Sequence, residues 1–377
     1  MILFVFTQTL YASTQFLTLS DIHYGSKNNS GQGQDTGDDL LQLAMTKLSQ
    51  LAAKVEFIIY LGDMPTHGSY EVKEKELYEK IVFQSLYRAN TLAKPMFYIP
   101  GNNDSLAGNY QPFTQNGRSP LNLAEDWSGA CVHCENLIID DQYMYEGGYY
   151  ASYAIPNNHD LILIALNSTQ FLNFPSRYPP YPNQRKEAQV QLQWFAKQLA
   201  NHQAKQLLIA MHEPPGFDYQ GQQYWETQYL EQFLTAIKKN QTHYQEITLL
   251  TSHTHMDEIR KINLDESHTL YAFSTPSISR IHNNNPAMKI FDLGNDLSLK
   301  NFVTHYTHTV ETWLDEHYYA MNSSDSIFPQ CNYLNLTACL NSLSQETACK
   351  AITSGLFYGV KNTLVDNSHC HNIYQVN

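Results

Sequence analysis

Short apolar runs alternate with amphipathic segments along most of this chain. Six of these runs are typical of buried strands, at 16–20, 57–61, 96–99, 161–166, 207–210 and 247–250. Between them, apolar residues recur with helical spacing over 41–52 and 188–199. Strands that alternate with helices indicate a layered α/β domain, which we place at residues 15–295.

The C-terminal part of the chain, residues 296–377, follows a different pattern. Apolar residues recur there at every fourth position, which predicts one helix, at Phe302, Tyr306, Val310 and Leu314. Four cysteines lie beyond that segment, at Cys331, Cys339, Cys349 and Cys370. We therefore expect a small helical subdomain that is pinned by disulfide bonds.

The six cysteines form an even set whose spacing does not match a paired CxxC zinc site. Disulfide bonds are the better interpretation, and they imply an oxidising compartment. Cys131 and Cys134 are close in sequence but follow no thioredoxin-like βαβ pattern, so we interpret them as a structural loop bridge. The pairing stays open, because six cysteines allow 15 connectivities.

The first residues of the chain fit two interpretations. Residues 1–6 are apolar and 11–13 resemble the end of a signal peptide, yet no Lys or Arg occurs before Lys27. The segment is either the remnant of a signal peptide, at 1–14, or an ordinary first strand. Together with the cysteines we favour the signal peptide and a secreted or periplasmic protein. No run reaches about 18 apolar residues, so we predict no membrane span.

Composition and charge narrow the classes of function. Hydrophobic residues make up 42% of the chain and aromatic residues 12%, which excludes a disordered protein. The formal net charge is −13. This argues against nucleic acids and anionic membrane surfaces as partners, because both attract clustered Lys and Arg. A small-molecule substrate fits better.

Polar clusters follow nearly every expected strand. They contain seven candidate metal ligands, namely Asp21, His23, Asp63, Asn102, His212, His253 and His255. Ligands bind beyond the carboxyl ends of strands in open α/β sheets, so we expect these side chains to meet. A lone D-x-H or H-x-H is more often a chance match, but the ordered set predicts two adjacent divalent cations with one bridging carboxylate.

The order of these motifs resembles that of the calcineurin-like metallophosphoesterases. Finer details resemble the acid sphingomyelinase and sphingomyelinase-like phosphodiesterase branch, in segments 62–67, 167–169, 212–216, 253–258, 275–279 and 285–286. The resemblance covers roughly residues 15–295, and the cysteine-bearing tail is also similar to that branch. It implies a four-layer αββα sandwich with a small, disulfide-pinned C-terminal subdomain.

Carried over position by position, the resemblance implies two metal-binding sets. Asp21, His23 and His255 would hold one cation. Asn102, His212 and His253 would hold the other, with Asp63 as the bridge. The branch uses Zn²⁺, whereas composition alone leaves Mn²⁺ and Fe open.

The third motif departs from the family pattern. The family usually has a histidine after the metal-binding asparagine, and this histidine helps to protonate the leaving group. Here Asn103 stands in its place, and an amide cannot act as a general acid. His67 matches a second active-site histidine of the branch, so our hypothesis is that His67 alone is the acid. The alternative is that His67 caps the backbone or orients a metal ligand.

Asp35, Asp38 and Asp39 precede the amphipathic segment 41–52. We interpret these carboxylates as the N-terminus of that helix, where they interact favourably with the helix dipole.

The expected activity is hydrolysis of a phosphodiester or pyrophosphate bond by a hydroxide activated between two metals. The branch acts on nucleotides, nucleotide-choline, phosphocholine-type diesters and sphingomyelin. The chain begins directly with the catalytic domain and shows no saposin-like module, which favours soluble substrates over membrane lipid. One alternative is a sphingomyelin or phospholipid phosphodiesterase. Another is a catalytically weakened metal-binding homologue, because Asn103 replaces the acid. A cytoplasmic Ser/Thr protein phosphatase fits the cysteines less well.

Overall fold

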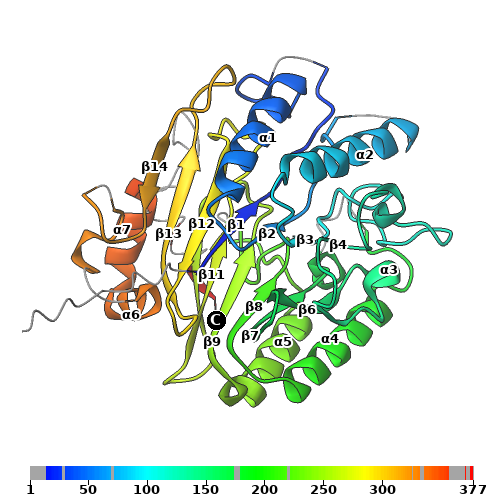
Figure 1. The fold of residues 1–377 in the computed structure, drawn as a ribbon. Helices are drawn as coiled ribbons and strands as arrows, with labels where there is room; N and C mark the ends of the chain where they lie inside the picture. Colours follow the sequence, from blue (N-terminus) through cyan, green and yellow to red (C-terminus); the bar gives the residue numbers. More distant parts are fainter. Residues whose placement is uncertain are drawn as a thin grey trace, which may run out of the picture.

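The computed structural model describes residues 14–27, 30–68, 72–173, 179–218, 221–324, 326–331, 335–355, 370 and 374–376. The predicted signal peptide at 1–14 lies outside them except for Thr14, which begins the first strand. Two β-sheets face each other, and helices cover both outer faces (Figure 1). This is the α/β sandwich that the family resemblance implies.

The first sheet has seven strands in the order β14-β13-β12-β1-β2-β3-β4. Its central strands β1, β2 and β3 run parallel, and the others pair antiparallel. The strands are β1 Thr14–Leu19, β2 Phe57–Tyr60, β3 Met96–Tyr98, β4 Cys131–Val132, β12 Ala287–Leu293, β13 Leu299–Tyr306 and β14 Glu316–Tyr319.

The second sheet has eight strands in the order β15-β10-β11-β9-β8-β7-β6-β5. Strands β7, β8, β9 and β11 form its parallel centre. The strands are β5 Ile138–Asp140, β6 Tyr150–Ile155, β7 Asn158–Ala165, β8 Ala204–Ala210, β9 Tyr244–Thr251, β10 Ile259–Asn263, β11 Thr269–Ser274 and β15 Gln375–Val376.

Four long helices form the outer layers. Helices α1 and α2 lie against the first sheet, and α4 and α5 against the second (Figure 1). Their bounds are α1 Asp38–Ala52, α2 Val72–Ala89, α4 Gln184–Asn201 and α5 Thr227–Asn240. The shorter helices are α3 Met144–Gly147, α6 Leu336–Ser342 and α7 Gln345–Gly355, with 3-10 turns at Pro120–Leu123, Ser168–Phe171, Gln241–His243 and Pro329–Cys331.

Strand periodicity divides the apolar side chains between two cores. In β8, Leu208 packs into the core between the sheets, whereas Leu207 and Ile209 pack against α4 and α5. Both faces of this strand are therefore buried, which explains its continuous apolar run.

The six strands and two helical segments expected from apolar periodicity are all present. The prediction of a helix at Phe302–Leu314 is wrong. Phe302 and Tyr306 lie in strand β13, and Val310 and Leu314 lie in no helix or strand. In a strand that is buried on both faces, apolar and polar residues do not alternate. The apolar residues of β13 therefore also fitted the spacing of a helix.

Strands β12 and β13 pair across the domain boundary that we placed at 295, and that division stays a prediction.

Disulfide bonds join Cys131 to Cys134, Cys331 to Cys339, and Cys349 to Cys370. The first is the expected loop bridge, and the other two pin the C-terminal region around α6 and α7. No helix in the described part of the chain is both long enough and apolar enough to cross a bilayer.

Candidate dimetal site

The carboxyl ends of five parallel strands converge where the two sheets meet. Each of the seven predicted ligands lies just beyond one of these ends. Asp21 and His23 follow β1, Asp63 follows β2, Asn102 follows β3, His212 follows β8, and His253 and His255 follow β9. The structure brings all seven together. Four come from the first sheet and three from the second.

The backbone is left-handed at most of these positions. The φ angles are 49° at Asp21, 47° at His23, 61° at Asp63, 71° at His253 and 62° at His255. Non-glycine residues seldom adopt this conformation, although Asp, Asn and His adopt it more readily than most. Such strain concentrates at functional sites, where the surrounding fold holds it in place.

Two glycines permit close packing beside Asp63. A Cβ on Gly62, where φ is +87°, would lie 2.4 Å from the Gly101 nitrogen. A Cβ on Gly101 would lie 2.2 Å from Asp63 Oδ1. The ends of β2 and β3 therefore approach so closely that neither position has room for a side chain.

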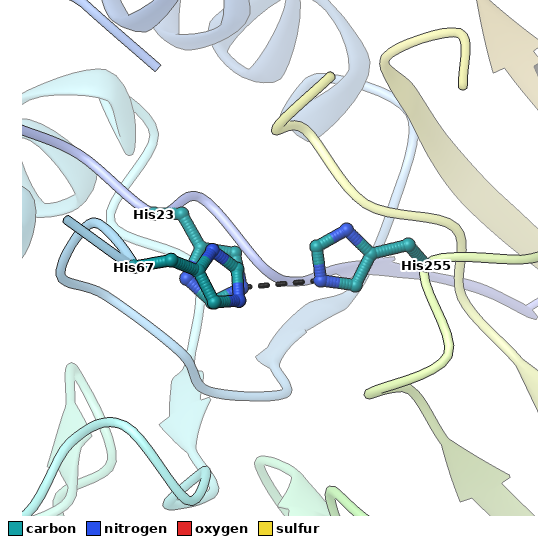
Figure 2. Close-up of side chains that lie close together, drawn as sticks. All are labelled: His23, His67 and His255. Carbon is teal, nitrogen blue, oxygen red and sulfur yellow. Dashed lines mark hydrogen bonds between the residues drawn. The ribbon is translucent and has the colours of Figure 1, made fainter. Parts of the chain in front are cut away.

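The first ligand set is Asp21, His23 and His255. His23 Nε2 lies 3.2 Å from His255 Nε2, and Figure 2 shows these two nitrogens facing each other. Asp21 Oδ1 is 3.6 Å from His23 Nε2 and 3.5 Å from His255 Nε2. Ligand atoms around a tetrahedral cation with bonds of about 2.0–2.1 Å are roughly 3.3 Å apart. These separations fit one cation.

Asp63 lies between the first set and the second. Its Oδ2 is 3.5 Å from His23 Nε2 and 3.2 Å from His212 Nε2. His253 completes a group with Asp63 and His212 whose ligand atoms lie within 4.8 Å of one another. Asn102 lines the same cavity as Asp63 and His253.

Hydrogen bonds fix the tautomers of two histidines. His23 Nδ1 lies 2.9 Å from the Pro65 carbonyl oxygen, and His212 Nδ1 lies 2.6 Å from that of Leu61. A carbonyl only accepts, so each Nδ1 carries a proton, and in the neutral imidazole Nε2 is the nitrogen with the lone pair. Metal-binding histidines in proteins are commonly held in this way.

Several buried atoms at the site have no hydrogen-bond partner among the described residues. They include Asp21 Oδ1, Asn102 Oδ1 and His212 Nε2, and also His255 Nδ1. Buried polar atoms are rarely left unsatisfied, and the first three are good ligands for a divalent cation. The residues therefore fit a pair of divalent cations.

The electrostatics of the site also favour positive charge. Burial lowers the pKa of His23, but the neighbouring carboxylates of Asp21, Asp63 and Asp35 outweigh it and raise the pKa to about 9. In contrast, burial and the neighbouring His212 lower the pKa of His253 to about 3. The carboxylates thus attract a cation, and a neutral imidazole is available to bind it.

Asn103 does not face the cavity as a free amide. Its backbone N–H donates to Asp63 Oδ1 and its Nδ2 donates to Asp63 Oδ2, both at 2.8 Å. The neighbouring Asp104 accepts hydrogen bonds from the backbone nitrogens of Asp63 at 3.0 Å and Gly101 at 2.8 Å. Both residues hold the predicted bridging carboxylate in place.

His67 stacks on His23, with ring centroids 3.8 Å apart, and lies beside the first ligand set (Figure 2). Its Nδ1 is 3.1 Å from Asp35 Oδ1, and its backbone N–H donates to Asp35 Oδ2 at 2.7 Å. The sequence placed Asp35 with the helix N-terminus, but α1 begins at Asp38. Asp35 instead orients His67, a contact that no motif signalled.

A cavity of about 370 Å³ opens onto these residues. Besides the predicted residues, it is lined by Asn109, Tyr110, Tyr224 and His282, none of which was singled out from the sequence. The His282 ring lies 4.7 Å from that of His255. Tyr224 and Tyr110 approach the His253 ring edge-on, at 5.5 and 6.5 Å.

Comparison with known proteins gives a family match. The calcineurin-like phosphoesterase profile matches residues 14–257. A curated relative, "Sphingomyelinase phosphodiesterase D" from Dictyostelium discoideum, is 28% identical in an alignment of 270 residues that covers 69% of this chain. The chain aligns with only 57% of that relative's length.

Solved structures were also compared with the chain. A dimetal phosphatase from Danio rerio has a TM-score of 0.49 and 12% identity, over 82% of this chain and 98% of that one. PhoD has a TM-score of 0.45 and 12% identity, over 78% and 66%.

Proposed function

Because the chain belongs to the calcineurin-like phosphoesterase family, we propose that it hydrolyses phosphodiester or pyrophosphate bonds of small substrates. The substrate classes are nucleotides, nucleotide-choline and phosphocholine-type diesters. The observation that carries the proposal is the position of Asp63 Oδ2, within 3.5 Å of His23 Nε2 and 3.2 Å of His212 Nε2. One carboxylate oxygen thus lies close to both ligand sets, as a dimetal hydrolase requires.

We propose zinc as the metal in both sets. Imidazole nitrogen together with carboxylate or amide oxygen suits Zn²⁺, although Mn²⁺ and Fe accept similar donors. Bound cations of this kind supply Lewis-acid charge and lower the pKa of water. Elemental analysis of protein purified without added metal tests this assignment, and manganese or iron in place of zinc would contradict it.

The proposed acid is His67. Asp35 accepts from its Nδ1 at 3.1 Å, which leaves Nε2 as the nitrogen that delivers a proton to the leaving oxygen. The Asn103 amide cannot act as a general acid, and its N–H groups donate hydrogen bonds to Asp63. A single acid makes substrates with good leaving groups, such as nucleotide pyrophosphates, better suited to this site than simple alkoxide esters.

The cavity wall favours substrates with an aromatic or cationic group. Tyr110 and Tyr224 lie next to the ligand His253, where their rings can contact a part of the substrate beyond the reacting phosphoryl group. Tyrosine rings bind nucleobases by stacking and quaternary ammonium groups by cation–π attraction. This supports nucleotides and choline-phosphate compounds over plain phosphomonoesters.

We also propose that the protein acts outside the cytoplasm. Three disulfide bonds in the described residues fit an oxidising compartment. The resemblance to a sphingomyelinase-named relative supports the same location.

The test is a substrate panel on chelator-stripped protein with and without restored Zn²⁺. The panel contains bis-p-nitrophenyl phosphate, cytidine diphosphocholine, ATP and sphingomyelin in micelles. We expect zinc-dependent turnover of the soluble substrates. Turnover that persists in chelator would contradict the dimetal mechanism. Activity on micelles alone would favour the lipid phosphodiesterase, and no turnover by the zinc-loaded protein would favour a metal-binding homologue without catalysis.

A further inference from the structure

A second group of metal-binding side chains lies on elements that contribute nothing to the dimetal site. His305 belongs to β13, His317 belongs to β14, and Asp315 immediately precedes β14. His305 and His317 are direct partners across the antiparallel pair. Strand β14 is the edge of the seven-stranded sheet, at the left in Figure 1.

The geometry of this group is close to that of a metal site. The two imidazole rings are 5.5 Å apart, and His305 Nδ1 lies 3.8 Å from Asp315 Oδ1. One ligand atom from each of the three residues lies within 4.8 Å of the others. Ligand atoms around tetrahedral zinc are roughly 3.3 Å apart. The His317 nitrogen nearest to Asp315 Oδ1 is Nδ1, at 4.0 Å, so the Asp315 side chain would have to turn towards His317 Nε2 to complete the site.

His305 has a nitrogen without a hydrogen-bond partner. Its side chain is only 8% exposed, and no described residue forms a hydrogen bond with Nδ1. An unsatisfied buried nitrogen of this kind is unfavourable unless a proton donor or a cation reaches it.

His317 is held in a form that suits coordination. Its Nδ1 lies 2.9 Å from the backbone oxygen of Asp315, which places the proton on Nδ1. Nε2 then has the lone pair. A ring N–H donated to a backbone carbonyl is the usual support for a metal-binding histidine.

One neighbouring charge opposes a cation here. Lys47 on α1 is buried, and its Nζ lies 3.6 Å from Asp315 Oδ1. The ammonium partly neutralises the carboxylate, so this group should bind a cation more weakly than the dimetal site. Asp315 is 78% exposed and can turn from the lysine to a metal.

From these contacts we propose that His305, Asp315 and His317 form a separate binding site for a transition-metal cation, Zn²⁺, which fastens edge strand β14 to β13. The site holds a structural cation and does not depend on the proposed phosphoesterase activity. Two histidines and one carboxylate provide three zinc ligands, and water would supply the fourth.

The experiment counts zinc ions bound by untagged, chelator-stripped protein in competition with a chromophoric chelator. We expect three equivalents for the wild-type chain and two for His317→Gln. The exposed pair Asp265 and His268 offers a matched control, because it lacks a second histidine. His268→Gln should therefore still bind three. Turnover at the dimetal site should stay within twofold of wild type in both variants.

If His317→Gln does not fold, two further variants still test the proposal. Asp315→Asn changes an exposed side chain and should also lose the third equivalent. Lys47→Met should tighten the third site about tenfold, because it removes a nearby positive charge. The proposal would be overturned if the wild-type chain and both ligand variants bound the same number of zinc ions. Unchanged zinc affinity in Lys47→Met would also overturn it.

Discussion

At the scale of single residues, Asp35 is the side chain on which the orientation of the proposed acid depends. It is buried and accepts hydrogen bonds from Thr66 Oγ1 at 2.8 Å and Ser279 Oγ at 2.8 Å, in addition to its two contacts with His67. Both neighbouring hydroxyls fix the carboxylate, so His67 has one favoured orientation.

We predict that Asp35→Asn lowers turnover of substrates with alkoxide leaving groups about tenfold to a hundredfold, as the loss of an orienting partner commonly does. An amide cannot stabilise the protonated imidazole that donates to the leaving oxygen. Hydrolysis of a p-nitrophenyl diester, which needs little proton donation, should change much less. Steady-state rates on both substrates check this.

Ser279→Ala is the control for that variant, because it removes one donor to Asp35 and leaves the contact with His67 in place. It should change both rates by less than Asp35→Asn does. An equal loss on both substrates in Asp35→Asn would instead indicate general damage to the site.

The same carboxylate predicts a pH effect on stability. Burial raises the pKa of Asp35, but the hydrogen bond with His67 and the charge of His23 outweigh it and hold the pKa well below its ordinary value of 3.8. A lowered pKa stabilises the folded protein above about pH 4, and this contribution is lost as the pH falls below that value. The free energy of unfolding of wild type should therefore exceed that of Asp35→Asn at pH 6, and the difference should begin to shrink as the pH falls below about 4. Urea denaturation at several pH values measures the difference, and a constant gap would contradict the assignment.

At the scale of elements, the site depends on how closely the ends of β2 and β3 approach. We predict that Gly101→Ala abolishes most zinc-dependent turnover, because its Cβ would lie 2.2 Å from Asp63 Oδ1 and displace that carboxylate. Gly68→Ala is the matched control, since the nearest atom to its Cβ would be Thr66 Oγ1 at 3.6 Å. Zinc stoichiometry and turnover measure both variants, and normal zinc binding by Gly101→Ala would contradict the prediction.

The sequence predicted six of the central parallel strands, namely β1, β2, β3, β7, β8 and β9, and the candidate ligands that follow five of them. Strand β12 was missed because it carries Lys289 and Asp292, and Lys289 is buried only because it pairs with Asp257 from another segment. An ion pair between distant segments leaves no periodic pattern in the sequence, so it cannot be predicted from one. For the same reason Asp35 and His282 were missed as site residues, since they lie in irregular segments whose contacts depend on the folded chain.

At the scale of the whole molecule, the proposed dimetal ligands come from both sheets, so bound cations would join the two halves of the sandwich. We predict that Zn²⁺ raises the melting temperature of the stripped protein. Ligand at 100 times its Kd stabilises a folded protein by about 2.7 kcal/mol. Differential scanning calorimetry measures the shift. Asp63→Asn should reduce it strongly, and an undiminished shift in that variant would argue against Asp63 as the bridge.

The C-terminal disulfides should affect stability rather than chemistry. Cys349 and Cys370 are 21 residues apart in sequence. A cross-link that closes a loop of this length stabilises a protein by about 3 kcal/mol. Replacing both cysteines by serine should lower the free energy of unfolding by about this amount and leave kcat within about twofold. A large loss of kcat with unchanged stability would contradict this expectation.

The division of the seven ligands between two sheets also bears on the order of events when the chain folds. Neither sheet alone can present both Asp63 and His212. During refolding, secondary structure can therefore return before any catalyst exists. The first appearance of product would mark the moment at which the two halves have docked in register.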